Sequence, residues 1–193
     1  MNANFFYDGF KAAITEDKYM PLYYGNTSKF TTAITEEINQ LIQCMGFKSQ
    51  NEYYRIDAIG WKHRNDEAKS EAEDIELNWH QWDLEIAVEH ENDLADWTDE
   101  LTKLIHIRCP LKVVIGYNHW DCREETEQKK LAYAAKWMQQ IRAFDPAAKE
   151  EYLIILGNTY SKNNKAKSED FDYRGYLYDY ESAQFIRLKD EDK

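Results

Sequence analysis

Residues 84–91 read LEIAVEHE, and this stretch decides how the chain is arranged. Its side chains alternate in character: Leu84, Ile86 and Val88 form one set, and Glu85, Ala87, Glu89 and Glu91 form the other. Successive side chains of a strand point to opposite faces of a sheet, so the alternation predicts a β-strand with one face on a core. The same geometry places Glu89 and Glu91 on one face of that strand.

A second stretch, residues 54–61, reads YRIDAIGW and carries Asp57. It lies in a strand predicted over residues 52–62, because aromatic and β-branched residues favour strands. We expect this strand and the strand of Glu89 to be neighbours. Carboxylates gathered in a poorly solvated site repel each other, and a divalent cation such as Mg²⁺ or Mn²⁺ removes that cost. The sequence therefore predicts a metal site made of Asp57, Glu89 and Glu91.

The spacing of apolar residues and the positions of Pro and Gly predict the helices and loops. Apolar residues at helical spacing predict helices over 3–16, from Thr27 or Ser28 to Gly46, over 93–107 and up to residue 144. Asp121 with Glu124 predicts a capping box for the last of these. Pro21 and Gly25 predict a loop, and the charged stretch 65–74 predicts an exposed connection.

Two nearly continuous apolar runs, 111–117 and 152–157, predict strands that are buried on both faces. The helix between them makes a βαβ unit, so these two strands should be parallel. Residues 171–179 and 184–188 predict a C-terminal β-hairpin rich in tyrosine. The expected fold is α/β, with a mixed β-sheet flanked by helices in a single domain over 1–193, a core at about 30–157 and the hairpin at 171–188.

Length and composition indicate the number of domains and the cellular compartment. A length of 193 residues suits one domain with a sizeable core. The three cysteines have no metal-like spacing, so we expect reduced thiols and a cytoplasmic protein. The N-terminal residues do not resemble a secretory signal, and we expect no membrane partner, since no apolar run approaches the ~18 residues of a membrane span.

The formal net charge of −12 argues against a protein that holds phosphates through a large basic patch. Acidic residues nevertheless gather in segments, and basic residues gather elsewhere, at Lys62–Arg64 and at Lys162, Lys165 and Lys167. A metal bound by the carboxylates would neutralise part of the negative charge. The lysine-rich loop at 161–170 would then be available for phosphate contacts.

The order of helix, strand with Asp, strand with Glu-x-Glu, helix and apolar strand resembles the PD-(D/E)xK nuclease superfamily, which includes restriction endonucleases. The resemblance covers residues 30–117. It implies a restriction-endonuclease-like sheet and Mg²⁺-dependent hydrolysis of phosphodiester bonds, in DNA rather than RNA, by an endonuclease that is compatible with a homodimer. It also implies that Asp57 and Glu89 are metal ligands, and that Glu37 supports the site from the first core helix.

The chain departs from this family at Glu91, which stands where the family usually has a lysine. Glu91 would then serve as a general base or as a ligand of a second metal. Lys62, Lys103 or Lys112 would supply the missing positive charge from elsewhere. Helical geometry disfavours Lys103, since it falls opposite the apolar face formed by Leu94, Trp97, Leu101 and Ile105.

Other interpretations remain open from the sequence alone. Loss of the lysine is compatible with a catalytically inactive nuclease-like protein, and the net charge with an acidic protein that mimics DNA. His90 lies on the apolar face of its strand, which favours a packed core histidine over a catalytic one. Glu85 would be a surface acid, His119 a loop histidine, and the hairpin tyrosines half-buried sheet residues that could instead stack bases.

Overall fold

The computed structural model describes residues 2–14, 16–63, 67–77, 82–94, 96–159 and 171–189. Its helices are α1 (Ala3–Ala13), α2 (Glu16–Gly25), α3 (Thr27–Cys44), α4 (Glu67–Asp74), α5 (Trp97–Ile105) and α6 (Glu124–Met138), with a 3-10 turn at Pro146–Ala148. Its strands are β1 (Lys48–Tyr53), β2 (Ile56–His63), β3 (Trp82–His90), β4 (Leu111–Asn118), β5 (Glu151–Asn158), β6 (Arg174–Asp179) and β7 (Gln184–Arg187). Within these described ranges, no helix combines the length and apolar character needed to cross a membrane.

The strands form one mixed sheet in the order β1-β2-β3-β4-β5-β6-β7. Strands β3, β4 and β5 are parallel, as expected of the two apolar runs and the helix between them. The outer pairs are antiparallel, and β6 with β7 is the predicted C-terminal hairpin. Every residue of β4 is buried, which agrees with a strand covered on both faces.

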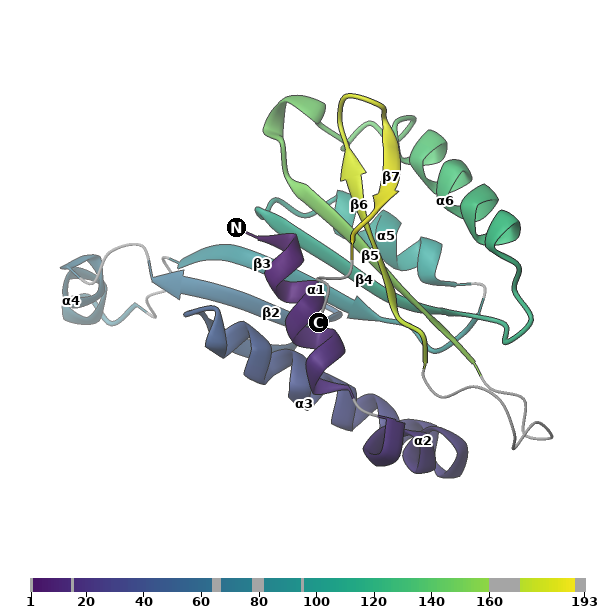
Figure 1. Ribbon diagram of the computed structural model, residues 1–193. Coiled ribbons are helices and arrows are strands. Elements are labelled where there is room, and N and C mark those ends of the chain that lie inside the picture. Colours follow the sequence, from purple (N-terminus) through teal and green to yellow (C-terminus); the bar gives the residue numbers. More distant parts are fainter. Residues whose placement is uncertain are drawn as a thin grey trace.

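Helices cover both faces of the sheet, which we call the α3 face and the α5 face (Figure 1). On the α3 face, helices α1 and α3 pack against side chains that include Val88 and Ile115. On the α5 face, helices α5 and α6 pack against side chains that include Ala87 and Val114. The predicted mixed sheet flanked by helices in one domain is confirmed.

A close approach fixes helix α5 on the sheet. A Cβ atom added to Gly116 in β4 would lie 2.7 Å from Cβ of Trp97, the first residue of α5. Such a distance is too short for two carbon atoms, so only glycine lets the helix sit this low. Trp97 is buried as a result, and the rest of α5 extends over β3 and β4.

Four local predictions were wrong. The strand expected over 52–62 is a hairpin, because Tyr54 and Arg55 adopt positive φ angles of 50° and 65° and turn the chain between β1 and β2. The loop expected around Pro21 is helix α2, which contains that proline. The helix expected to reach residue 144 ends at Met138, whereas the connection expected over 65–74 is present and contains helix α4. Asp121 does not cap α6, since its carboxylate binds His119 instead.

A network of buried polar side chains joins α6 to the sheet on the α5 face. The Arg174 guanidinium in β6 donates to Oε1 of Glu127 at 2.8 Å and to Oε2 at 2.6 Å. Tyr176 and Asn118 also donate to this carboxylate, and Asn158 accepts from Arg174 at 3.0 Å. Glu127 and Arg174 thus neutralise each other inside the protein.

The pKa of Glu127 predicts how stability depends on pH. Burial raises this pKa, but the hydrogen bonds from Arg174 and Tyr176 outweigh burial, so the folded pKa lies below its ordinary value. The stabilisation is therefore complete above the unfolded pKa of about 4.3 and is lost as pH falls through the folded pKa. Glu127→Gln should cost about 3 kcal/mol at pH 7 in urea unfolding, because it leaves a buried guanidinium without its main partner.

Measuring wild type and Glu127→Gln at low pH distinguishes loss of the ion pair from a defect in packing. The difference between wild type and Glu127→Gln should shrink as pH falls below about 4, where the wild-type carboxylate becomes protonated. Glu125→Gln, at an exposed position of the same helix, is the matched control and should show no such trend. A difference that stays constant with pH would contradict the assigned role of the ion pair.

Candidate active site

The structure brings Asp57 and Glu89 together. Strand β2 pairs with β3 so that Ala58 lies opposite Val88, and the next residue along each strand is Asp57 and Glu89. The backbone N–H of His90 donates to Oδ2 of Asp57 at 2.8 Å, which holds this carboxylate against the end of β3. The expected pairing of the two strands is confirmed, and both acids lie on the α5 face with Lys103.

Helix α5 adds a lysine to this pair. Nζ of Lys103 lies 2.8 Å from Oε1 of Glu89 and donates a 3.0 Å hydrogen bond to the carbonyl oxygen of Arg55. It also forms an ion pair with Glu100, one turn earlier on the helix. The side chain of Lys103 is 35% exposed, whereas that of Glu89 is 1% exposed. The ammonium therefore closes the site from its solvent side.

The prediction that Lys103 points away from the site was wrong. Lys103 does lie off the apolar face of α5, which is formed by Trp97, Leu101, Leu104 and Ile105. However, the four-carbon stem of a lysine reaches around the flank of a helix. The end of β2 lies beside that flank, so the ammonium meets Glu89 there.

The site carries more negative than positive charge. Burial is the main cause that raises the pKa of Asp57, and the N–H of His90 and the charge of Lys103 offset it in part. Burial also raises the pKa of Glu89, and the nearby charges of Asp57 and Glu100 raise it further against the opposing effect of Lys103. Three acids thus share one ammonium in a partly dry environment, which favours the uptake of a proton or of an additional cation.

The donor atoms fit a hard divalent cation. Oε1 of Glu89 is buried and accepts no directed hydrogen bond, although Lys103 lies beside it. Among the described residues, no group of three or more Asp, Glu, His or Cys side chains converges as a complete metal cage. Mg²⁺ needs no such cage, since one or two carboxylates with water and substrate phosphates commonly hold it. Asp57 and Glu89 are the two carboxylates that fit.

Glu91 lies outside this pair. Strand β3 ends at His90, so the alternation that would place Glu91 beside Glu89 stops one residue too early. The carboxylate of Glu91 accepts the backbone N–H of Asp93 at 2.7 Å, and its own N–H donates to the carbonyl oxygen of Ile115. Its contacts shape the loop that leads into α5, and the predicted grouping of Glu91 with Asp57 and Glu89 is not seen.

Glu37 lies on the opposite side of the sheet. It belongs to α3, whose residues Ile34 and Ile38 pack into the core of the α3 face. Its carboxylate accepts a 2.6 Å hydrogen bond from Lys18 and another from the hydroxyl of Tyr19. The expectation that Glu37 supports the site is therefore wrong in its geometry, because the helix covers the other face.

The pairing of Glu37 with Lys18 is a local one at the contact between α2 and α3. The hydrogen bond from Lys18, followed by that from Tyr19, lowers the pKa of the Glu37 carboxyl below its ordinary value. A carboxylate that is already paired in this way joins two helices and has no need of a metal. Its contacts therefore give Glu37 a structural role.

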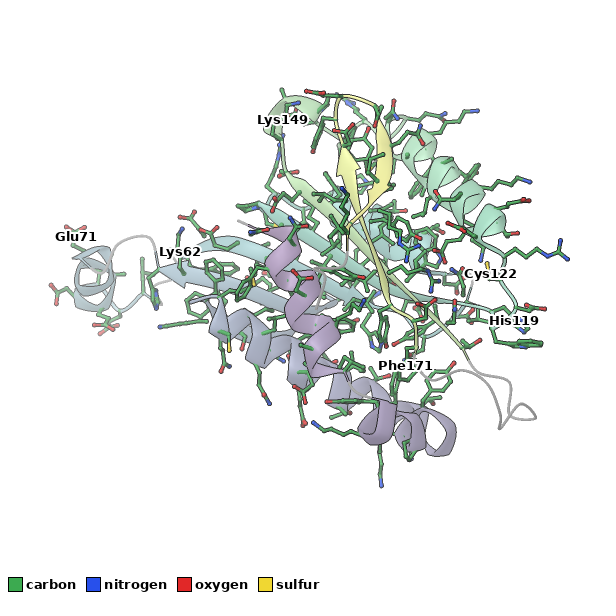
Figure 2. The ribbon with its side chains drawn as sticks, viewed as in Figure 1. Lys62, Glu71, His119, Cys122, Lys149 and Phe171 are labelled. Atoms are coloured by element: carbon green, nitrogen blue, oxygen red, sulfur yellow. The ribbon has the colours of Figure 1, made fainter. Side chains whose placement is uncertain are left out.

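The two histidines singled out by the sequence differ in their surroundings. His90 is buried on the α3 face, where Nε2 lies 3.0 Å from the hydroxyl of Tyr117, and burial lowers its pKa to about 3. It is thus a neutral core histidine, as its position on the apolar face predicts. His119 is exposed and pairs with Asp121. Figure 2 shows His119 at the opposite end of the sheet from Lys62.

The other candidates are accounted for by packing. Glu85 is buried and pairs with Lys62, so it is not the expected surface acid. Three of the hairpin tyrosines, Tyr173, Tyr176 and Tyr178, are buried in the two cores, and the half-buried Tyr180 stacks on Phe144. Lys112 is buried against Glu150 and Tyr152. The lysine-rich loop at 161–170 lies outside the described residues.

The comparisons with known proteins add no relative. No family model matches the sequence, and no curated protein matches it either. The geometry of Asp57, Glu89 and Lys103 is therefore the guide to function.

The charge balance of the site predicts the effect of removing Lys103. Burial raises the pKa of Glu89 to about 8, so its carboxylate is charged at pH 9. Lys103→Met keeps most of the stem but leaves this carboxylate without its cation, so the free energy of unfolding at pH 9 should fall by about 1–2 kcal/mol. Adding Glu89→Gln to this variant should recover most of the loss, because the amide carries no charge. Urea unfolding measures both effects.

The matched control is Lys136→Met, at an exposed position on α6. It should change the free energy of unfolding by no more than about 0.5 kcal/mol. If Lys103→Met behaves like this control, or if Glu89→Gln brings no recovery, the ion pair has not been assigned correctly.

Proposed function

We propose that the protein is a Mg²⁺-dependent nuclease of the PD-(D/E)xK type that hydrolyses phosphodiester bonds in DNA. The observation that carries the proposal is the meeting of Asp57, Glu89 and Lys103 on one face of the sheet. Two acids and a lysine are the side chains that the sequence resemblance calls for. Here the lysine comes from α5, in place of the position held by Glu91.

Each of the three side chains has a role that its chemistry allows. Asp57 and Glu89 would hold the metal through carboxylate oxygens, and the N–H of His90 orients Asp57 for this purpose. Bound Mg²⁺ would supply Lewis-acid polarisation of the phosphate and a more acidic water. Lys103 carries three N–H donors and no acceptor, so it orients oxygen atoms and stabilises negative charge, and does not accept a proton.

The reaction itself requires little covalent chemistry from the protein. A water oxygen forms a new bond to phosphorus, one P–O ester bond breaks, and the leaving oxygen takes up a proton. Negative charge grows on the phosphate oxygens during this exchange, and an ammonium placed beside them lowers the barrier. The retention of a lysine at the site favours an active enzyme over a nuclease-like protein that has lost its chemistry.

Substitutions separate the roles of the acids. Asp57→Asn and Glu89→Gln should each abolish Mg²⁺-dependent cleavage of plasmid and oligonucleotide DNA while the circular dichroism spectrum stays unchanged. Lys103→Met should reduce the cleavage rate by about 10²–10³-fold, the usual effect of removing one charge-stabilising donor. Glu37→Gln and Glu91→Gln are matched controls and should retain cleavage within a few-fold, since neither carboxylate faces the pair.

Calorimetric titration with Mn²⁺ tests the metal separately from cleavage. Wild type should show saturable binding at one or two sites, and Asp57→Asn/Glu89→Gln should lose it. Cleavage that survives in both single variants of the acids, or metal binding that survives in the double variant, would overturn the proposed function.

A further inference from the structure

A strip of aromatic rings runs along the β1–β2 edge of the sheet and is not used by the proposed chemistry. It consists of Tyr54, Tyr53, Trp82, Trp61 and His63, and we call it the aromatic strip. Neighbouring ring centroids are 4.6, 5.2, 5.8 and 5.0 Å apart in that order, and the rings meet mostly edge to face, so they form an unbroken row of contacts.

The aromatic strip lies on the α5 face, the same face as the acids. Tyr53, Trp61 and Trp82 pack at the margin of the core on that face and remain partly exposed. In the part of the chain that the structure describes, the main contacts of α5 and α6 with the sheet are to β3, β4 and β7, and Lys103 of α5 also reaches the β1–β2 turn. Tyr54 is 83% exposed. An aromatic ring held at a turn with this exposure contributes little to the core.

The Tyr54 end of the aromatic strip lies next to the candidate active site. Arg55 follows Tyr54 in the turn, and its carbonyl oxygen accepts the hydrogen bond from Lys103. Trp61 is four residues from Asp57 on β2, which places it about 13 Å along the same strand. A polymer that lies on the rings therefore arrives beside Lys103, at the solvent side of the candidate active site, without crossing the sheet.

Cations accompany the rings in small number. Nζ of Lys48 lies 5.1 Å from the centre of the Trp61 ring, and Arg55 flanks Tyr54. Lys62 is already paired with Glu85. In a chain with a net charge of −12, this is too little positive charge to hold the two backbones of a duplex. Rings with few cations are instead suited to unpaired bases, which stack on aromatic side chains whatever their sequence.

We propose that the aromatic strip binds single-stranded DNA by base stacking and leads it to Asp57, Glu89 and Lys103. The inference rests on the proposed nuclease function in one respect, since it names the substrate class of that site. The binding surface itself can be tested without any cleavage.

The binding test uses the Glu89→Gln protein in the absence of divalent metal, so that cleavage does not interfere. The probes are fluorescein-labelled (dT)₁₂ and a 12-base-pair duplex, followed by fluorescence anisotropy. We expect the single strand to bind at least tenfold more tightly than the duplex. Tyr54→Ala and Trp61→Ala should each weaken single-strand binding by about 5- to 150-fold, the range expected for loss of one stacked base.

Two further variants control for the ring and for the protein surface. Tyr54→Phe keeps the ring and should bind as tightly as the parent. Tyr133→Ala removes a tyrosine that is 67% exposed on α6, away from the strip, and should have no effect. Raising the salt concentration from 50 to 200 mM should weaken binding by less than about tenfold, since only about two phosphate contacts are available.

The outcomes separate this inference from the proposed function. Equal or tighter binding of the duplex, or single-strand binding that Tyr54→Ala and Trp61→Ala leave unchanged, would overturn the strip as a binding surface even if wild type cleaves DNA. If the protein binds (dT)₁₂ through the rings but cleaves no DNA, the aromatic strip is supported as a binding surface and the proposed nuclease function is excluded. Tyr54→Ala keeps the result decisive if Trp61→Ala fails to fold.

Discussion

The register between β2 and β3 is the constraint on which the candidate site depends. Ala58 lies opposite Val88 on the α3 face. The next residue along each strand is Asp57 or Glu89, and both of these lie on the α5 face. A shift of one residue would move Asp57 to the other face and replace it with an apolar side chain. That shift is opposed because it would place the Asp57 carboxylate among the apolar side chains of the α3 face. The packing of the α3 face thus fixes the position of Asp57.

Helix α5 is the second determinant, and its place follows from a single glycine contact. Gly116 admits Trp97 against β4, and the rest of the helix then lies along the sheet with Lys103 beside the end of β2. The bond from Lys103 to the carbonyl oxygen of Arg55 ties the β1–β2 turn to the same lysine. The ammonium group of Lys103 therefore contacts the end of β3 through Glu89 and the β1–β2 turn through Arg55.

Much of the fold could be predicted from the sequence, because its signals are local, whereas the site depends on which helix covers which face. The apolar runs of β4 and β5 each describe one buried strand, and the structure agrees with them. The alternation in residues 84–91 predicts strand β3 but not its faces, because an irregularity in the pairing with β2 places Leu84 on the α5 face while Ile86 and Val88 lie on the α3 face. The strand also ends before Glu91. The β1–β2 turn carries none of the Gly or Asn signals that usually accompany positive φ, and Pro21 lies inside a helix that proline would usually end. No local pattern tells that α3, and Glu37 with it, covers the far face. A helical wheel likewise describes where the Cβ atom of Lys103 points and not how far its ammonium reaches.

Charge balance distinguishes this site from the other buried charges of the protein. Glu127 forms an ion pair with Arg174, and Lys112 forms one with Glu150, so each of these charges is neutralised by a partner. The outcome for Glu127 is a lowered pKa, as expected of an acid whose partner stabilises its charged form. Glu89 has the opposite shift, although a lysine lies beside it, because it is buried and because Asp57 and Glu100 share that lysine. A balanced pair holds a fold together, whereas a buried acid whose positive partner is shared takes up a proton more readily, and its pKa rises. The imbalance at Asp57 and Glu89 therefore sets this site apart from the balanced ion pairs that hold the rest of the fold together.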